Sequence, residues 1–233
     1  MDKIYSFRLQ TLDRLKVYAE LSKLRLSSFV ILSLLVGYLF ANMGHPIHWS
    51  TFMLFVIGGS LVTFASNAIN QVIEKESDRL MKRTMTRPLP EGRITSIEAI
   101  LFIGVVAVSG ILILTVTINP MTGLLSALSL LIYGFLYTPL KRISSIAVFV
   151  GAIPGALPPL LGYVAYTNHL DQTAVWLFLV QFFWQFPHFW SIAWIGYDDY
   201  LKADMMLLPS NGKTRMSALI TLIYSLVLIP LSF

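Results

Sequence analysis

Three oxygen-bearing side chains spaced four residues apart are the strongest chemical signal in this sequence. Asn70, Glu74 and Asp78 follow an i, i+4, i+8 spacing, and Lys82 extends the row by one further turn. In a helix, this spacing places all four side chains along one face. Such a row suits Mg²⁺, a hard cation that binds through one or two carboxylates together with substrate phosphates.

The segment that follows this row is a basic loop stiffened by two prolines. It reads KRTMTRPLPEGR over residues 82–93 and includes Arg83 and Arg87. Guanidinium groups match phosphate oxygens through paired, charge-assisted hydrogen bonds. Carboxylates followed closely by arginines therefore predict a metal–diphosphate site. The alternative is a solvated loop in which acidic and basic residues pair with one another.

A second acidic cluster, Asp198, Asp199 and Asp204, follows a later apolar stretch. Carboxylates on two different helices would hold Mg²⁺ between them and a diphosphate, and the metal would neutralise the charge of the leaving group. The predicted metal ligands, which are also the predicted catalytic residues, are Asn70, Glu74, Asp78, Asp198 and Asp199.

Composition then shows which elements must position these side chains. Of the 233 residues, 56% are apolar and 12% are charged, whereas a soluble domain is about 25% charged. A soluble enzyme and a disordered chain are therefore excluded, and the absence of cysteine excludes disulfides and thiolate metal sites. Seven apolar stretches are long enough to span a bilayer as helices, so the predicted fold is an all-α polytopic transmembrane bundle. These stretches are 24–43, 52–73, 97–117, 121–138, 144–166, 174–195 and 216–233.

The basic residues predict the orientation of the bundle. All 17 Lys and Arg residues lie before the first stretch, at its start (Arg25) or in alternate loops, hence on one side. By the positive-inside rule that side is the cytoplasm, which also holds the N-terminus. Nucleic acid is not an expected partner.

Residues 1–20 are interpreted as a cytoplasmic leader, either soluble or lying along the membrane surface. The last stretch reaches Phe233 without a polar anchor, which favours a chain truncated at its C-terminus.

Two of the spans carry features that a lipid-facing helix would lack. In the sixth, Gln181, Gln185 and His188 share one face. Polar residues within a membrane usually face the bundle interior and mark a site, although a histidine bonded to a neighbouring helix is the alternative. The fifth span contains Pro154, Pro158 and Pro159 among several glycines, which predicts a broken or kinked helix.

The stretch from Asn67 to Arg93 resembles the first signature of the UbiA superfamily of intramembrane prenyltransferases. That signature is an Asn-x-x-x-Asp-x-x-x-Asp row followed by Arg-Thr-x-x-Arg-Pro-Leu, and in this chain Glu74 replaces the first Asp. Three further stretches resemble the protohaem IX farnesyltransferase branch of the superfamily. They are ELSKLR at 20–25, YTPLKR at 137–142 continuing into GAIPGALPPLLG at 151–162, and WQFPHFWSIAW at 184–194 followed by DDYLKA at 198–203.

The resemblance implies transfer of a farnesyl group from farnesyl diphosphate to a vinyl group of haem b, giving haem o, with Mg²⁺ as cofactor. Haem b is then a substrate, and other enzymes of haem a and haem o synthesis are an expected class of partner. The implied location is the plasma (inner) membrane. Two departures are that Asp204 stands where the family commonly has glycine, and that the family has nine spans, so two C-terminal spans would be missing.

The substrate-binding residues are assigned from both lines of reasoning. Basic side chains would hold phosphate oxygens, and polar residues of the sixth span would face haem. Two alternatives stay open besides an inactive fragment: a prenyltransferase for another acceptor, such as a quinone precursor, and a cation-coupled transporter. The predicted substrate-binding residues, within a single domain of residues 1–233, are Lys23, Arg25, Lys82, Arg83, Arg87, Tyr137, Lys141, Gln185 and His188.

Overall fold

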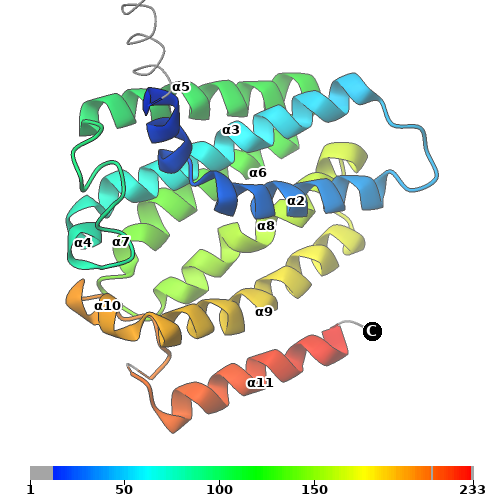
Figure 1. Cartoon of the computed structure of the whole chain (residues 1–233). Coiled ribbons are helices and arrows are strands. Elements are labelled where there is room, and N and C mark those ends of the chain that lie inside the picture. Colours follow the sequence, from blue (N-terminus) through cyan, green and yellow to red (C-terminus); the bar gives the residue numbers. More distant parts are fainter. Residues whose placement is uncertain (1–12, 211, 232–233) are drawn as a thin grey trace, which may run out of the picture.

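All regular elements in residues 13–210 and 212–231, the part of the chain that this computed structural model describes, are helices. The long helices lie side by side, with the short ones near their ends (Figure 1). The helices are α2 (Leu24–Ala41), α3 (Trp49–Ile73), α4 (Lys75–Leu80), α5 (Ser96–Ile113) with the π-helix η1 (Leu114–Ile118), α6 (Pro120–Leu131) with the π-helix η2 (Ile132–Tyr137), α7 (Thr138–Leu140), α8 (Ala147–Thr167), α9 (Gln172–Ile195), α10 (Tyr197–Lys202) and α11 (Arg215–Leu231).

Each of the seven predicted apolar stretches forms a helix, so the predicted multi-span helical architecture is confirmed. Among the described residues, five runs are long and apolar enough to cross a membrane: Leu24–Ala41, Trp49–Ile73, Ser96–Ile118, Pro120–Leu140 and Ala147–Thr167. The other two helices are α9, which carries the polar stripe predicted for the sixth span, and α11, which has 17 residues.

Local sequence signals explain where several helices begin. Thr95 and Glu98 form a capping box at the start of α5, each side chain bonded to the other residue's backbone N–H. Asn119 caps α6 and is followed by Pro120 at the first helical position, where a missing N–H has no cost. Asp171 accepts a hydrogen bond from a backbone N–H of the first turn of α9 at 3.0 Å.

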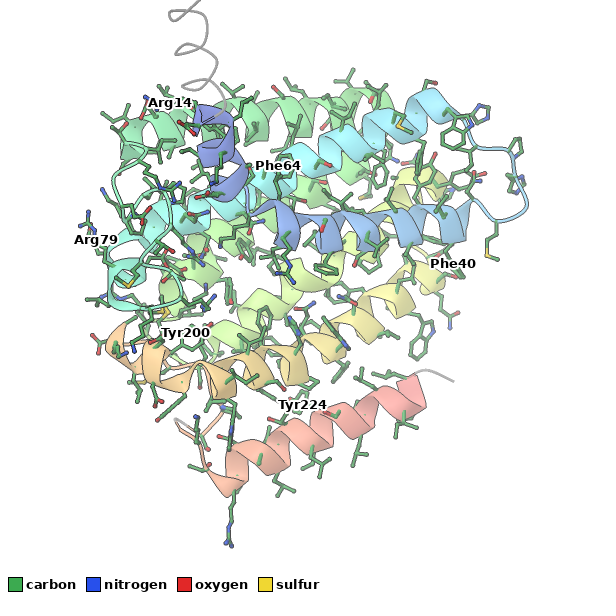
Figure 2. All side chains as sticks on the ribbon, viewed as in Figure 1. Arg14, Phe40, Phe64, Arg79, Tyr200 and Tyr224 are labelled. Carbon is green, nitrogen blue, oxygen red and sulfur yellow. The ribbon has the colours of Figure 1, made fainter. Side chains whose placement is uncertain are left out.

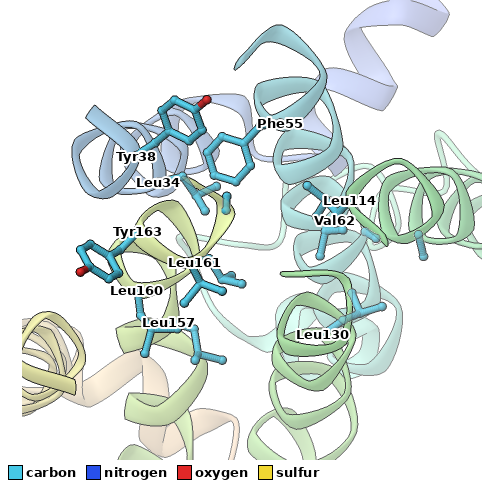
Figure 3. Close-up of a cluster of buried hydrophobic side chains, with 14 of the residues drawn as sticks. Leu34, Tyr38, Phe55, Val62, Leu114, Leu130, Leu157, Leu160, Leu161 and Tyr163 are labelled. Atoms are coloured by element: carbon cyan, nitrogen blue, oxygen red, sulfur yellow. The ribbon is translucent and has the colours of Figure 1, made fainter. Parts of the chain in front are cut away.

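Helix α8 is the centre of the bundle, and it packs against α2 and α9. A side chain at Gly162 or Gly37 would overlap backbone atoms of the facing helix, so α2 and α8 touch backbone to backbone. Small residues at such crossings are the usual means by which membrane helices approach closely. The core around this crossing includes Leu34, Phe55 and Leu161 (Figure 3).

The fifth span, predicted to be broken or kinked, is not broken. Helix α8 runs without interruption through its three prolines. Pro159 has no N–H, so the carbonyl of Gly155 one turn earlier loses its usual helical donor. The side chain of Gln185 on α9 replaces that donor, with Nε2 at 3.0 Å from the Gly155 oxygen. The neighbouring helix therefore satisfies one of the backbone groups freed by proline.

Only the end of the predicted leader lies within the described residues. Residues 1–12 lie outside the described residues, but residues 13–21 form a helix. Its Val17 and Leu21 are buried against Leu89 and Ile94, which belong to the segment that follows α4. The i, i+4 spacing of Val17 and Leu21 therefore serves a contact within the protein. The predicted position of the leader along the membrane surface stays a prediction.

The predicted site segments gather at one end of the bundle. In Figure 1, α4, α7 and α10 lie together at that end, far from the loop that joins α2 to α3. Figure 2 shows Arg79 and Tyr200 at the same end and Phe40 at the opposite end. Charged residues that are distant in the chain therefore become neighbours.

Candidate active site

The predicted row of Asn70, Glu74 and Asp78 is present and buried. The helix is interrupted at Glu74, which separates α3 from α4. The backbone bonds from Glu74 N to Asn70 O and from Asp78 N to Glu74 O, at 2.9 and 2.7 Å, nevertheless keep the four-residue repeat. The three side chains therefore stay on one face, and Asp78 is fully buried.

Each member of the row has its own basic partner, and the three partners come from three different segments. Lys23, just before α2, donates to Asn70 Oδ1 at 2.7 Å. Lys141, just after α7, donates to Glu74 Oε1 at 2.8 Å. Arg87 in the basic loop places Nη1 at 2.8 and 2.6 Å from the two Asp78 oxygens. Two acids and three bases form one cluster, in which Glu74, Asp78 and Lys141 are buried and Lys23 and Arg87 are half-buried. With every group charged, the cluster has one positive charge in excess.

Burial and these pairings shift the pKa values of the cluster. Burial, assisted by the charge of Arg87, lowers the pKa of Lys23 to about 7. Burial would raise the pKa of Glu74, but the ammonium group of Lys141 holds it below its ordinary value. For Asp78 burial dominates and raises the pKa, although Arg87 opposes it. A site with several groups under such opposing forces is typical of a functional centre.

The second acidic cluster meets the first at the basic loop. Asp199 on α10 pairs with Lys202 at 3.1 Å. Its pKa is lowered by the hydrogen bond from that side chain and by the backbone N–H groups of Arg83 and Lys82. The Arg83 guanidinium also donates to the hydroxyl of Tyr200 at 3.2 Å.

An apolar contact and a backbone hydrogen bond complete this junction between the two clusters. Met81 packs against Ala203 and Met205, and Met206 N donates to Lys141 O at 3.1 Å. The ends of the second and sixth spans therefore adjoin, as the sequence predicts.

The donors of the row are correct in kind for Mg²⁺, which requires only one or two carboxylates besides phosphate oxygens. Within the described residues, no three His, Cys, Asp or Glu side chains converge as a metal cluster. The oxygens of Glu74 and Asp78 instead face basic side chains. If Arg87 and Lys141 moved to a diphosphate, Asp78 and Glu74 would each lose a positively charged partner. A divalent metal that arrived with the diphosphate would supply both of these positive charges.

The predicted substrate-binding residues are not all brought together. Lys82 is exposed and contributes its backbone N–H to Asp199. Asp198, a predicted metal ligand, is also exposed. Arg25 is exposed on the first turn of α2, where it lines an open groove with Lys23 and Phe29.

Tyr137 lies inside the site, beneath Lys141. The Lys141 ammonium is 4.4 Å from the centre of the Tyr137 ring, a geometry that favours a cation over the ring face. Tyr137 ends the π-helix η2, and π-helical turns are frequent at functional sites. Gly151 on α8 makes room for this ring, since a side chain there would overlap it.

The polar stripe of α9 has two separate surroundings. Gln185 is buried and bonds the backbone of α8, so its position is explained by packing. His188 is exposed and stacks on Trp184, with ring centres 4.5 Å apart and planes 16° from parallel. Phe189 links this face to the site, with its ring 5.9 Å from that of Tyr137.

Sequence reasoning missed two residues that help to build the site. Thr138 is buried between Asn70, whose Nδ2 lies 3.4 Å from its hydroxyl, and the carbonyl of Tyr133 at 2.8 Å. Tyr200 receives the guanidinium of Arg83. Thr138 follows Tyr137 and Tyr200 follows Asp199 in the sequence. Their position next to predicted site residues is the sequence signal that could have identified them.

Replacing Asp204 by glycine is expected to stabilise the protein by about 0.5–1 kcal/mol, because Asp204 has a φ of +53°, in the left-handed region where glycine carries no steric cost. Thermal unfolding of the detergent-solubilised protein measures the effect. Asp204→Ala is the control and should destabilise it. A lower melting temperature for Asp204→Gly would contradict this explanation.

Known proteins resemble this chain in sequence over nearly its whole length. The UbiA prenyltransferase family model matches residues 30–233. A protoheme IX farnesyltransferase of Cytophaga hutchinsonii is 47% identical over 224 residues, which cover 95% of this chain and 77% of the relative. A Flavobacterium johnsoniae protein of the same name is 46% identical, covering 91% and 71%. The human mitochondrial protoheme IX farnesyltransferase is 39% identical, covering 91% and 48%.

Solved structures resemble the fold. A digeranylgeranylglyceryl phosphate synthase superposes with a TM-score of 0.77 at 22% identity, covering 94% of this chain and 76% of the other. A UbiA homologue from Archaeoglobus fulgidus, solved with DMAPP and Mg²⁺, superposes with a TM-score of 0.70 at 16% identity, covering 92% and 75%. At these identities the likeness concerns the fold alone. The five long apolar helices and the family match make this chain an integral, multi-pass membrane protein.

Proposed function

Because this chain belongs to the UbiA prenyltransferase family, we propose that it transfers a farnesyl group from farnesyl diphosphate to a vinyl group of haem b, giving haem o. The relatives that are more than 40% identical to this chain carry the name of that reaction. The enzyme is a Mg²⁺-dependent prenyltransferase, and the acceptor is a substrate instead of a resident cofactor.

One observation is the main support for placing the diphosphate at this end of the bundle. Lys23, Arg87 and Lys141 reach one buried acidic row from three different segments. A diphosphate that arrives with a divalent cation matches such a cluster, because the bases donate charge-assisted hydrogen bonds to its oxygens and the cation balances the acids. On binding, the three bases would exchange their amide and carboxylate partners for phosphate oxygens. The acidic oxygens would then be free for a cation.

Mg²⁺ would be held by Asn70, Glu74, Asp78, Asp198 and Asp199, directly or through water, and when bound it supplies positive charge against the diphosphate. The basic side chains draw electron density in the same direction as the C–O bond of the substrate breaks and its electron pair passes to the diphosphate. The vinyl group of haem b forms the new C–C bond, and water supplies the hydroxyl group and releases a proton. Low water content around the site strengthens each of these electrostatic effects.

The acceptor would lie on the side of α9 that adjoins the site. His188 is the proposed haem contact, and its stacking on Trp184 orients the imidazole ring. Gln185 would act through the position of α9. Phe189 and Tyr137 provide an aromatic wall between the two substrates, where a cation would be stabilised by ring faces.

The protein is proposed to sit in the plasma (inner) membrane with the site facing the cytoplasm, as one catalytic domain. The support is the distribution of Lys and Arg, all of which fall on one predicted side. Farnesyl diphosphate enters from that side, and the lipid bilayer surrounds the helices. Enzymes that consume haem o are the proposed protein partners.

The mass of the product decides between acceptors. Purified protein is incubated with Mg²⁺, farnesyl diphosphate and either haem b or 4-hydroxybenzoate, with the Cytophaga relative as a positive control. The expected product is haem b that has gained a hydroxyl and a farnesyl group. Prenylated 4-hydroxybenzoate would favour the quinone-precursor alternative, and cation flux without diphosphate cleavage would favour a transporter.

Replacing His188 by alanine is expected to raise the KM for haem b roughly tenfold, equivalent to about 1.4 kcal/mol, with little change in the KM for farnesyl diphosphate. Steady-state kinetics with each substrate varied in turn measure both values. His169→Ala is a matched control, because His169 is an exposed histidine in the loop between α8 and α9. Equal effects on both KM values would refute the assigned role.

A further inference from the structure

The turn that leads from the N-terminal helix (residues 13–21) to α2 is held by the same helix that carries the acidic row. Lys23 lies in this turn with a left-handed φ of +47°, and its ammonium bonds Asn70. Gln71, the next residue on α3, is fully buried, and its Nε2 donates to Glu20 O at 3.1 Å and to Leu21 O at 2.7 Å. Two consecutive α3 side chains thus hold the turn at two points.

The position of the Gln71 amide is explained by the geometry of a helix end. The last carbonyls of a helix have no donor within the helix. Leu21 supplies such a carbonyl at the end of residues 13–21, whereas Glu20 O accepts from Lys23 N at 3.1 Å as well as from Gln71. Gln71 therefore ends the N-terminal helix where Lys23 must turn. The other amide atom, Gln71 Oε1, is buried and has no hydrogen-bond partner among the described residues. A buried oxygen without a hydrogen bond costs free energy. The two hydrogen bonds that the Gln71 nitrogen donates therefore explain why an amide stands at this position.

A second contact connects the same turn to the basic loop. Arg93 is 2.6 Å from the carboxylate of Glu20, and its Nη2 donates to Thr86 O at 2.8 Å. Thr86 directly precedes Arg87, the partner of Asp78. Leu21 and Leu89 are fully buried in the cluster between the helix and the loop. The end of the N-terminal helix and the loop are thereby joined by an ion pair and an apolar contact, and Arg93 also bonds the loop's own backbone beside Arg87.

We propose that Gln71 and Arg93 are positioning residues: together they fix Lys23 and Arg87 relative to one another, so that both cations meet one diphosphate, although neither positioning residue touches it. This inference rests on the proposed function, because it assumes that the diphosphate binds at these two cations. The N-terminal helix is then a structural part of the diphosphate site. Bases held in place before the ligand arrives bind it without a further ordering cost.

The first test replaces Gln71 by methionine, which has a similar volume but no donor. Removing the unpaired Oε1 offsets part of the lost hydrogen bonding, so the variant is expected to fold. The KM for farnesyl diphosphate should rise about tenfold, because misplacing a binding group by an ångström costs up to about 100-fold. The KM for haem b should stay unchanged.

The matched control is Asn119→Ser. Asn119 also donates from one buried amide to two successive carbonyls, Val164 O at 3.0 Å and Ala165 O at 3.4 Å, but it lies at the start of α6. Serine keeps the helix cap and removes the paired bonds. This variant should leave both KM values unchanged. A rise in the farnesyl diphosphate KM equal to that of Gln71→Met would overturn the proposal, because the effect would then be general loosening.

Arg93 offers a graded version of the test. Arg93→Met should raise the KM for farnesyl diphosphate, and Arg93→Lys should recover part of it, because lysine restores the charge opposite Glu20 but cannot also reach Thr86 O in the same geometry. An unchanged KM in both variants would overturn the role of Arg93. If lysine and methionine had equal effects, the ion pair would not be the operative contact.

Hydrogen–deuterium exchange separates this inference from the proposed reaction. In Gln71→Met, amides of residues 20–24 and of residues 82–93 should both exchange faster, whereas the control should leave both segments protected. Binding of inorganic pyrophosphate with Mg²⁺, measured by calorimetry, should weaken by the same factor as the KM rises. If turnover is absent but exchange and pyrophosphate binding change together, the reaction is wrong and the positioning role stands. If the two segments respond independently, the positioning role is wrong.

Discussion

Replacing Asp78 by asparagine is expected to lower turnover at least about 100-fold while the protein stays folded. Asp78 is fully buried and holds Arg87 through both carboxylate oxygens. Asparagine preserves the volume and one acceptor oxygen, but it removes the negative charge that a metal ligand must supply. Losses of this size follow when one group that stabilises developing charge is removed. The rate of haem o formation at saturating substrates measures the effect.

Glu76→Gln is the matched control for this prediction. Glu76 lies two residues earlier in α4, is exposed, and pairs with Arg79 at 2.7 Å. Exposed pairs contribute about 0–1 kcal/mol, so both turnover and stability should stay close to those of the parent protein. Unchanged activity in Asp78→Asn would remove the acidic row from the proposed mechanism.

Replacing Lys141 by methionine is expected to destabilise the protein by about 3–5 kcal/mol, because it leaves the buried carboxylate of Glu74 without its partner. Turnover should also fall, since a phosphate contact is lost. Thermal unfolding in detergent and the rate of haem o formation measure the two effects separately.

The double variant Glu74→Gln/Lys141→Met distinguishes stability from catalysis. Replacing a buried ion pair by neutral groups of similar volume is often neutral for folding, so the melting temperature should largely recover. Turnover should not recover, because a proposed metal ligand and a proposed phosphate contact are both absent. A double variant as unstable as the single one would show that the two side chains are not coupled, and recovered turnover would refute their assigned roles.

The sequence was sufficient to predict the helices because apolar length and end signals are local properties. Asn119 and Asp171 cap helices in the structure, and both are residue types whose preference for helix starts is local. The continuity of α8 could not be predicted, because it depends on a donor from another helix: Gln185 bonds the carbonyl that Pro159 leaves free. The packing of residues 13–21 was hidden for the same reason, since its apolar face fits a membrane or a protein equally well.

For the candidate site, spacing within one helix predicted the row of Asn70, Glu74 and Asp78, but it did not indicate their partners. Lys141 was selected as a residue at the edge of a span, whereas the structure places it on Glu74. Gln71 carries no motif of its own, and only the position of residues 20–21 gives it a role. Contacts between distant segments are set by packing, which a single sequence does not state.

The backbone contact between α2 and α8 has a consequence for how the protein is made. Gly37 and Gly162 belong to helices that leave the ribosome more than a hundred residues apart. Helix α2 therefore enters the lipid before α8, its main packing partner, has been synthesised. During this interval the face of α2 that carries Gly37 contacts lipid acyl chains. Helix α2 is then stabilised only by the hydrogen bonds within it. Chains arrested during synthesis before residue 147 would contain the acidic row but lack the surface against which α2 settles.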